Sequence, residues 1–206
     1  MELVAGFAAV VVVGVLAAAQ RLRRPGGVRA APIASIRDGV PCTVAGTVVR
    51  LPDTELLVSP ISGQSCVYYR ALVTRGTQPP ILVMSEERRT AFGLVDDTGR
   101  AVIDPAGATL ELDERRTGVG LTPPRQLIED LRARHPREWS DRLRFSERVI
   151  GPGDQLIVSG QSLREPDPDP TRAAADYREG ATRLRIGGSR RTPLVLRDPP
   201  GEPTLS

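Results

Sequence analysis

Hydrophobic and polar positions follow three different patterns along this chain. Residues 3–19 form an uninterrupted run of apolar residues and glycine, LVAGFAAVVVVGVLAAA. Beyond Ile33 the period changes to two, which is typical of half-buried strands. One stretch, Leu127 to Leu131, places apolar residues at helical spacing. We therefore predict a mainly β fold with one α-helix beyond the N-terminal apolar run.

The N-terminal run is long enough to cross a bilayer. At about 1.5 Å per residue it approaches the roughly 30 Å hydrocarbon core. A cleaved signal peptide is the alternative because Ala17–Ala19 resembles a cleavage site, but Glu2 precedes the run and the basic cluster Arg21–Arg24 follows it, the reverse of a signal peptide. We expect residues 1–22 to be a transmembrane helix in the lipid bilayer, with the N-terminus outside the cell membrane and the rest in the cytoplasm.

The remaining chain divides by composition. Short strands, many turns and a glycine inside a strand pattern at Gly46 favour a small, partly open β-barrel, with an OB-like barrel as one option. The expected segments are a juxtamembrane linker at 23–38, a β-rich domain at 39–165, a Pro/Asp-rich linker at 166–180, a C-terminal hairpin completing the domain at 181–198, and a tail at 199–206.

Composition argues against several functions. All 28 basic residues are arginine, so lysine-based Schiff-base or phosphate-loop chemistry is excluded, and the net charge of +3 is too small to demand a nucleic-acid partner. The chain has only three Phe, three Tyr and one Trp, and the adjacent Tyr68 and Tyr69 should point to opposite faces of a strand. We therefore expect no nucleic-acid binding.

The cysteines and the histidine do not form a catalytic or metal-binding pattern. Cys42 and Cys66 are distant in sequence, and the single histidine, His135, ends the predicted helix. A zinc site needs about four suitable ligands. A Ser, His and Asp set is also implausible with this histidine. We expect no metal or cofactor, and two buried reduced thiols, with a disulfide between them as the alternative.

The triplet Asp97-Thr98-Gly99 has two interpretations. The same triplet carries the catalytic aspartate of aspartic proteases, where two carboxylates share a proton. Here another aspartate precedes it, Arg100 follows it, and two apolar runs flank it at hairpin distance. We expect a turn between two strands.

The stretch from Leu57 to Arg70, LVSPISGQSCVYYR, predicts a strand end, a turn and a second strand. Pro60 and Gly63 set the turn, and Gly63 should adopt a positive φ. Strand alternation places Val67 and one of the two following tyrosines toward the core.

Alternation also places Arg70 on the same face as Cys66. An arginine there is either on a partly exposed face or paired with a carboxylate, and the candidates are Glu147, Asp97 and Asp104.

Three segments, SPISGQSCVYYR, FGLVDDTGRAVIDPAGA and FSERVIGPGDQLIVSGQ, resemble the GIDE-type domain. The resemblance covers roughly residues 39–164. In a mitochondrial ubiquitin ligase this membrane-proximal β-rich domain precedes a RING, and bacterial and archaeal members lack the RING. The resemblance thus implies a domain type. Because a RING binds two zinc ions through a Cys/His cluster that is missing here, ubiquitin-ligase activity is only a remote alternative.

These patterns together predict a membrane-anchored, non-catalytic module that docks an unknown protein partner. The alternative is a structural subunit of a larger membrane assembly, whose anchor packs through Gly6 and Gly14. The residues expected to bind the partner or to support the fold are Ser59, Pro60, Ser62, Gly63, Cys66, Tyr69, Arg70, Asp97, Gly99, Asp104, Glu147, Gly153 and Asp154.

Overall fold

The computed structural model describes most of the predicted β-rich region. The described residues are 30–76, 79–112, 117–119, 121–135, 143–167 and 182–199. None of the helices within these ranges is long and apolar enough to cross a membrane. The predicted anchor at 1–22, the start of the linker at 23–38, most of the linker at 166–180 and the tail from residue 200 lie outside the described residues.

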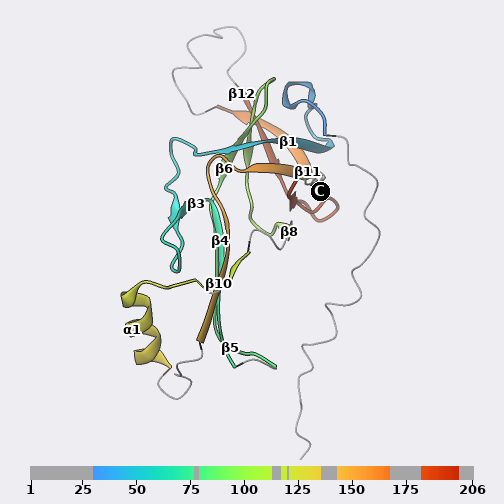
Figure 1. Ribbon diagram of the computed structural model, residues 1–206. Helices are drawn as coiled ribbons and strands as arrows, with labels where there is room; N and C mark the ends of the chain where they lie inside the picture. The colour runs from blue at the N-terminus through green and yellow to red at the C-terminus, as the bar shows by residue number, and fades with distance from the viewer. Residues whose placement is uncertain are drawn as a thin grey trace, which may run out of the picture.

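Five strands close into a barrel, seen in the upper part of Figure 1. Around the barrel the order is β1-β6-β7-β12-β11, and β1 pairs with β11 to complete the circle, so the expectation of a partly open barrel is wrong. The neighbours are antiparallel except for β7 and β12, which are parallel. The bounds are β1 Pro41–Val49, β6 Phe92–Val95, β7 Arg100–Ile103, β11 Gln155–Pro166 and β12 Thr182–Gly187.

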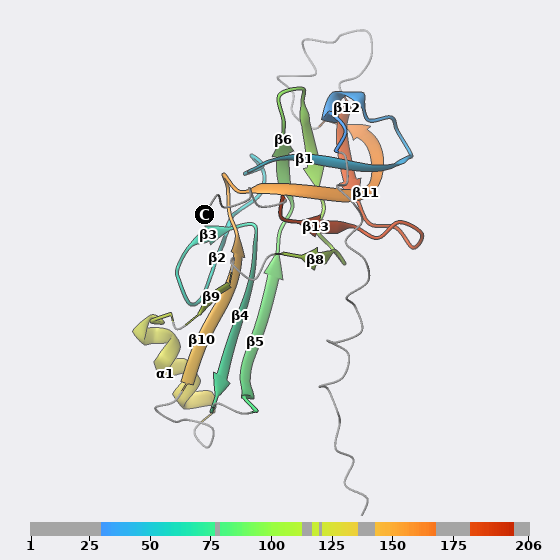
Figure 2. The ribbon, with the colours of Figure 1, turned by 45° about the vertical axis from the view of Figure 1, so that its right-hand side comes forward.

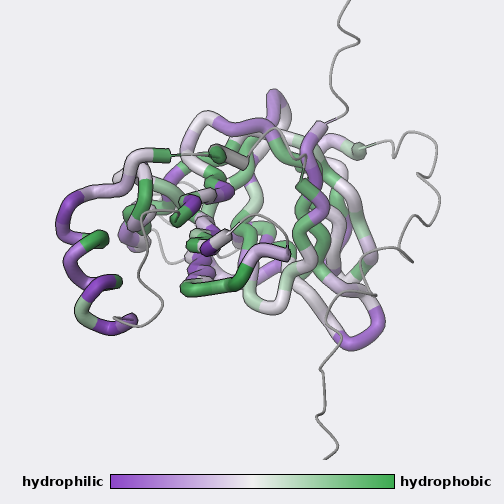
Figure 3. Tube along the Cα trace, turned by 60° about the horizontal axis from the view of Figure 1, so that its bottom comes forward, coloured by the Kyte–Doolittle hydropathy of each residue, from purple (hydrophilic) through white to green (hydrophobic). Residues whose placement is uncertain are grey.

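Alternate positions of these strands fill the barrel. In β1, Val44 and Val48 are fully buried while their neighbours are partly exposed, as period-two patterning predicts. Figure 3 shows hydrophobic residues along the barrel strands and a mainly hydrophilic helix at the edge of the molecule. Burying each such aliphatic side chain contributes roughly 1.5–3 kcal/mol.

A second sheet extends away from the barrel, as Figures 1 and 2 show. Its order is β5-β4-β10-β9, with β5 at Ile81–Arg89, β4 at Tyr68–Arg75, β10 at Leu143–Ile150 and β9 at Thr117–Val119. Helix α1, Arg125–Arg134, packs on this sheet through its buried Leu131. The charged run from Glu86 to Arg89 lies within β5.

The junction of the two sheets buries both adjacent tyrosines. Tyr68 packs into the barrel core, and Tyr69 packs into the core under the second sheet. Each is only 3% exposed. Alternation therefore holds, but both faces of β4 are covered at this point, so the expectation that only one tyrosine faces a core is wrong.

The C-terminal segment completes the barrel without forming the expected hairpin. Strand β12 pairs with the second half of β11, and β13, Val195–Arg197, pairs with its first half. The two strands thus follow one another along β11 instead of pairing together. On its other edge, β13 pairs in parallel with β8, Thr109–Glu111.

Residues 96–99, Asp-Asp-Thr-Gly, form the predicted turn between β6 and β7. The aspartate whose side chain holds this turn together is Asp96, and not Asp97. One carboxylate oxygen of Asp96 accepts hydrogen bonds from Thr98 N at 2.8 Å, Thr98 Oγ1 at 2.7 Å and Gly99 N at 2.8 Å. The other accepts one from Ile33 N at 2.8 Å, which fastens the short 3-10 turn η1, Ile33–Ser35, to the barrel. Asp97 is exposed.

We expect Asp96→Ala to lower the free energy of unfolding by about 2 kcal/mol because several charge-assisted hydrogen bonds are lost. Burial of Asp96 opposes its charged form, but the hydrogen bonds from Ile33, Thr98 and Gly99 outweigh it and lower the pKa. The contribution is therefore complete above the unfolded-state pKa, near about pH 4, and disappears as the pH falls through the lower folded-state value.

Chemical denaturation of both proteins between neutral and acidic pH tests this expectation. Asp97→Ala is the matched control, and it should change stability by less than about 0.5 kcal/mol. The role of Asp96 in holding the turn would be contradicted if both variants lost the same free energy of unfolding. It would also be contradicted if the loss for Asp96→Ala were as large in acid as at neutral pH.

Candidate functional site

The predicted signature turn connects two short strands, β2 at Leu57–Val58 and β3 at Ser65–Cys66. The Ser59 backbone N–H donates to Gln64 O at 2.9 Å, and the Gly63 N–H donates to Ser59 O at 3.0 Å. Gly63 has a φ of 71°, so the positive φ expected there is confirmed. Pro60 is half-buried at the start of the reversal.

Glu147 holds this turn from the second sheet. Its side chain comes from the middle of β10 and is only 5% exposed. Oε2 accepts a short hydrogen bond from the buried Ser59 hydroxyl and another from the Ser62 backbone N–H at 3.2 Å. Oε1 accepts none from the residues that the structure describes. The carboxylate thus fixes the turn and keeps one oxygen available.

A second turn joins β10 to β11 and lies beside the first. The Gly151 N–H donates to Asp154 Oδ2 at 2.9 Å, and Gly153 has a φ of 95°. Two backbone hydrogen bonds of 2.8 Å connect this turn to β1, from Gly153 N to Val48 O and from Val48 N to Asp154 O. The barrel therefore fixes the position of Asp154.

The two turns border one cavity of about 550 Å³. Such a volume lies within the roughly 300–1,000 Å³ typical of ligand pockets. Its apolar wall comes from Leu121, Val149 and Pro152, and its polar lining comes from Ser62, Gln64, Ser65, Glu147 and Asp154. We call it the Glu147 cavity.

The cavity brings together about half of the residues that we singled out in the sequence. Glu147, Ser62 and Asp154 line it, while Ser59, Gly63 and Gly153 shape the two turns around it. Cys66 lies buried at the end of the signature turn. Patterning did not identify Gln64, Ser65 or Leu121, because nothing local distinguishes exposed polar residues and an isolated leucine from ordinary turn and loop positions.

The other candidates lie elsewhere and have separate roles. The Tyr69 hydroxyl donates to Glu86 Oε1 at 2.6 Å, and burial together with this bond raises the pKa of Tyr69 to about 12. Asp104 pairs with Arg185 on β12 and accepts from the Ala106 N–H at 3.1 Å. Gly99 belongs to the β6–β7 turn.

Arg70 does not pair with any of the three carboxylates that we considered. Its side chain is exposed on the face of β4 opposite Glu147, with Glu87 and Arg148 beside it in the strand register. Arg70 shares its face of β4 with Tyr68, and this face is open beyond the barrel. The first of our two options, an exposed face, is therefore the correct one. Cys66 packs with Tyr69 and Ala71 on the other side, so the expectation that Arg70 and Cys66 share a face is wrong.

The chemistry of this cavity favours binding over nucleophilic catalysis. Ser59 has an adjacent carboxylate but is only 1% exposed, so a substrate could not reach its hydroxyl. Two carboxylates, hydroxyls and an amide offer acceptors to a cationic group. Within the described part of the chain, three or more His, Cys, Asp or Glu residues nowhere gather as a metal-binding group.

Cys66 should be a poor nucleophile despite its place beside the cavity. Burial, with a further contribution from the Glu147 carboxylate, raises the pKa of its thiol from 9.0 to about 11. Because the thiolate is the reactive form, we expect iodoacetamide to alkylate Cys66 about a hundredfold more slowly in the folded chain than in urea. Mass spectrometry of both samples measures this, and equal rates would contradict the buried placement.

No family model, curated protein or solved structure matches this chain. The resemblance to GIDE-type domains therefore stays a prediction from the quoted segments.

Proposed function

We propose that this chain is a membrane-anchored, non-catalytic interaction module that binds a protein partner through the Glu147 cavity. The supporting observation is that two turns more than 80 residues apart, both singled out in the sequence, border one open cavity around a buried carboxylate. Glu147 holds the signature turn through Oε2 alone. Its other oxygen, Oε1, is not needed for the turn, which supports a role for this oxygen in binding.

The partner should present a basic side chain. Glu147 and Asp154 are the charged residues of the cavity lining, and both are acidic. The free oxygen of Glu147 could accept a charge-assisted hydrogen bond from an arginine or lysine, which is about twice as strong as a neutral one. The apolar wall at Leu121, Val149 and Pro152 suits the aliphatic part of such a side chain.

The closed five-stranded barrel suits the proposal as a scaffold, and its strand order supports the expectation of an OB-like barrel. OB-folds are five-stranded Greek-key barrels. Here the third and fifth barrel strands along the chain, β7 and β12, form the one parallel pair among the five barrel strands. The second sheet is inserted between β1 and β6 and between β7 and β11, so the Glu147 cavity lies where these insertions meet the barrel. The proposed membrane anchor at 1–22 would hold this scaffold at the cytoplasmic face.

Replacing residues 1–22 with an unrelated transmembrane helix tests the proposal against the alternative of a structural subunit. Proximity labelling from the intact protein in its native membrane should recover the same neighbouring proteins from both chains. Loss of these neighbours after the replacement would instead favour a structural subunit that assembles through its anchor.

A further inference from the structure

A second cavity, of about 360 Å³, lies at the barrel surface and shares no lining residue with the Glu147 cavity. It is bordered by η1, by the chain after β1, by β7 and by the ends of β11 and β12 that meet there. Its apolar wall includes Ile33, Leu51, Val102 and Leu184. We call it the Arg100 cavity.

Three arginines from three different strands line this cavity. Arg100 comes from β7, Arg164 from β11 and Arg183 from β12. Asp53 and Asp167 also line it, and Asp53 is exposed at the surface. An apolar wall together with several guanidinium groups suits a ligand that has an anionic end and an apolar body.

Arg100 lines the cavity with donors that the described residues leave unused. Its Nε is enclosed and has no hydrogen-bond partner, and it is the only such buried side-chain nitrogen or oxygen in the described residues. Buried donors almost always have an acceptor, so this guanidinium is incompletely satisfied. Because Nε itself is covered, a ligand in the cavity would contact the terminal nitrogens of the group. The same guanidinium donates from Nη2 to Arg50 O at 3.1 Å, which holds its plane in place.

The neighbouring strand leaves room for this guanidinium. Gly93 on β6 lies directly beside it, and a Cβ at that position would come within 2.9 Å of Nε and 3.0 Å of Nη2 of Arg100. A larger residue would displace the group. The backbone of β6 thus forms part of the floor on which the Arg100 side chain lies.

The other two arginines retain donors for a ligand. Arg164 donates one side-chain hydrogen bond, to Ile36 O at 3.3 Å, out of the five that a guanidinium can make. Arg183 is paired with Glu165 at 2.6 Å, which neutralises its charge. Arg100 and Arg164 are therefore the two groups with unused donors on the cavity.

We propose that the Arg100 cavity binds the oxyanion, phosphate or carboxylate, of a small organic molecule whose apolar part lies against Leu51 and Val102. Arg100 is the main anchor and Arg164 the second. The source of the oxyanion is either a soluble metabolite or the headgroup of an anionic lipid, since both present the same chemistry. This inference does not depend on the partner proposed for the Glu147 cavity.

Phenyl phosphate is a suitable probe because it joins a phosphate to an apolar body. We expect calorimetric titration of the full chain in phosphatidylcholine nanodiscs to show saturable binding, and inorganic phosphate to bind more weakly. Arg100→Gln should weaken phenyl phosphate binding by at least about tenfold, because a charge-assisted hydrogen bond is lost. Arg164→Gln should weaken it by a smaller factor, and it keeps the test valid if Arg100→Gln does not fold.

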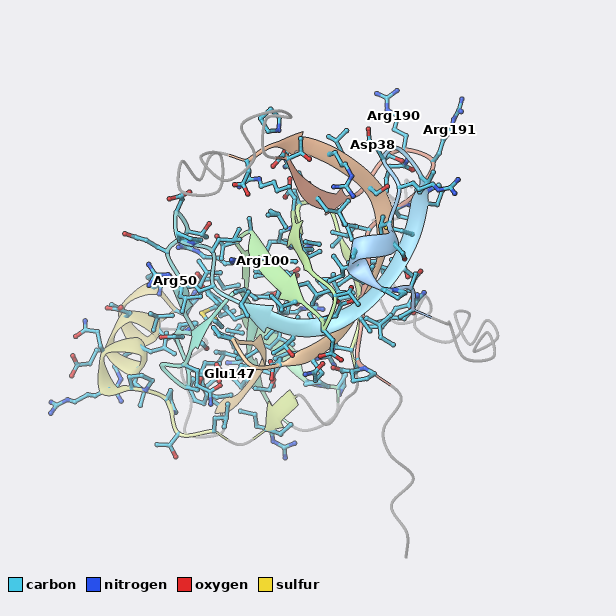
Figure 4. The ribbon with its side chains drawn as sticks, turned by 90° about the horizontal axis from the view of Figure 1, so that it is seen from above. Asp38, Arg50, Arg100, Glu147, Arg190 and Arg191 are labelled. Carbon is cyan, nitrogen blue, oxygen red and sulfur yellow. The ribbon has the colours of Figure 1, made fainter. Side chains whose placement is uncertain are left out.

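Arg190→Gln is the matched control, since it removes the same charge from an exposed loop that Figure 4 shows well apart from Arg100. It should leave the affinity unchanged. Nanodiscs that contain phosphatidic acid separate the two sources: competition with phenyl phosphate indicates a lipid headgroup, and no competition indicates a soluble ligand. Absence of saturable binding to both phosphates and to phosphatidic acid, or equal losses for all three variants, would overturn the proposal.

Discussion

Replacing Glu147 with leucine is expected to lower the free energy of unfolding by roughly 2–4 kcal/mol. The variant removes the acceptor for the buried Ser59 hydroxyl and for the Ser62 backbone N–H. It also removes the cost of burying a carboxylate, so the net loss is smaller than the sum of two charge-assisted hydrogen bonds. Urea denaturation of the full chain measures the difference.

Glu147→Gln is the matched control because its amide oxygen can still accept from Ser59. We expect it to lose only about 1 kcal/mol. In the background of Ser59→Ala, the leucine variant should cost much less than it does alone, since the hydroxyl that needs an acceptor is gone. A leucine variant at least as stable as the parent would show that burying the carboxylate costs at least as much as its hydrogen bonds contribute, and would contradict this expectation.

Adding one methyl group at Gly46 is expected to destabilise the barrel by about 3 kcal/mol or more. Gly46 pairs with Leu156 of β11 and directly precedes the residues of β1 that pair with β6. A Cβ there would lie 2.5 Å from Val95 O, a backbone atom that cannot move without breaking the barrel pairing. Gly46→Ala should therefore unfold at a much lower denaturant concentration, or fail to accumulate as a folded protein.

Gly187→Ala on β12 is the corresponding control. A Cβ at Gly187 would have no atom within 4 Å, so the variant should stay within about 0.5 kcal/mol of the parent. A Gly46→Ala protein that unfolds at the same denaturant concentration as this control would contradict the close approach of β1 and β6.

Local features were predictable from the sequence. The spacing of Pro60 and Gly63 predicted a turn with a positive φ. The glycine inside the β1 pattern at Gly46 indicated only a bulge or bend, and the close approach of Val95 O to this position was not predicted. These features depend on a few neighbouring residues, whose backbone preferences are strong. The period of two likewise predicted a β protein.

Features that depend on distant contacts were not predictable. The partner of Glu147 is Ser59, 88 residues away, and no local pattern distinguishes it from Arg70. The charged run from Glu86 to Arg89 lies inside the edge strand β5, which has a solvated side, so charge alone does not distinguish such a strand from a turn. Strand alternation correctly predicted that Tyr68 and Tyr69 point to opposite faces of β4. It could not predict that the barrel core covers one face and the core under the second sheet covers the other.

The most direct test of the proposed function places a positive charge in the Glu147 cavity. Ser65 lines this cavity and is exposed, so Ser65→Arg should occupy the cavity and pair with its carboxylates without disturbing the fold. Ser85→Arg adds the same charge to an exposed position of β5 outside the cavity. Figure 4 shows Glu147 apart from Arg100, and the two cavities have no lining residue in common, so neither variant changes a residue of the second cavity.

Proximity labelling in the native membrane then compares the two variants with the parent chain. The account predicts that Ser65→Arg loses the labelled partner while Ser85→Arg retains it, with both proteins equally folded and equally abundant. Retention of the same partners by Ser65→Arg and Ser85→Arg would contradict the claim that the Glu147 cavity is the binding site.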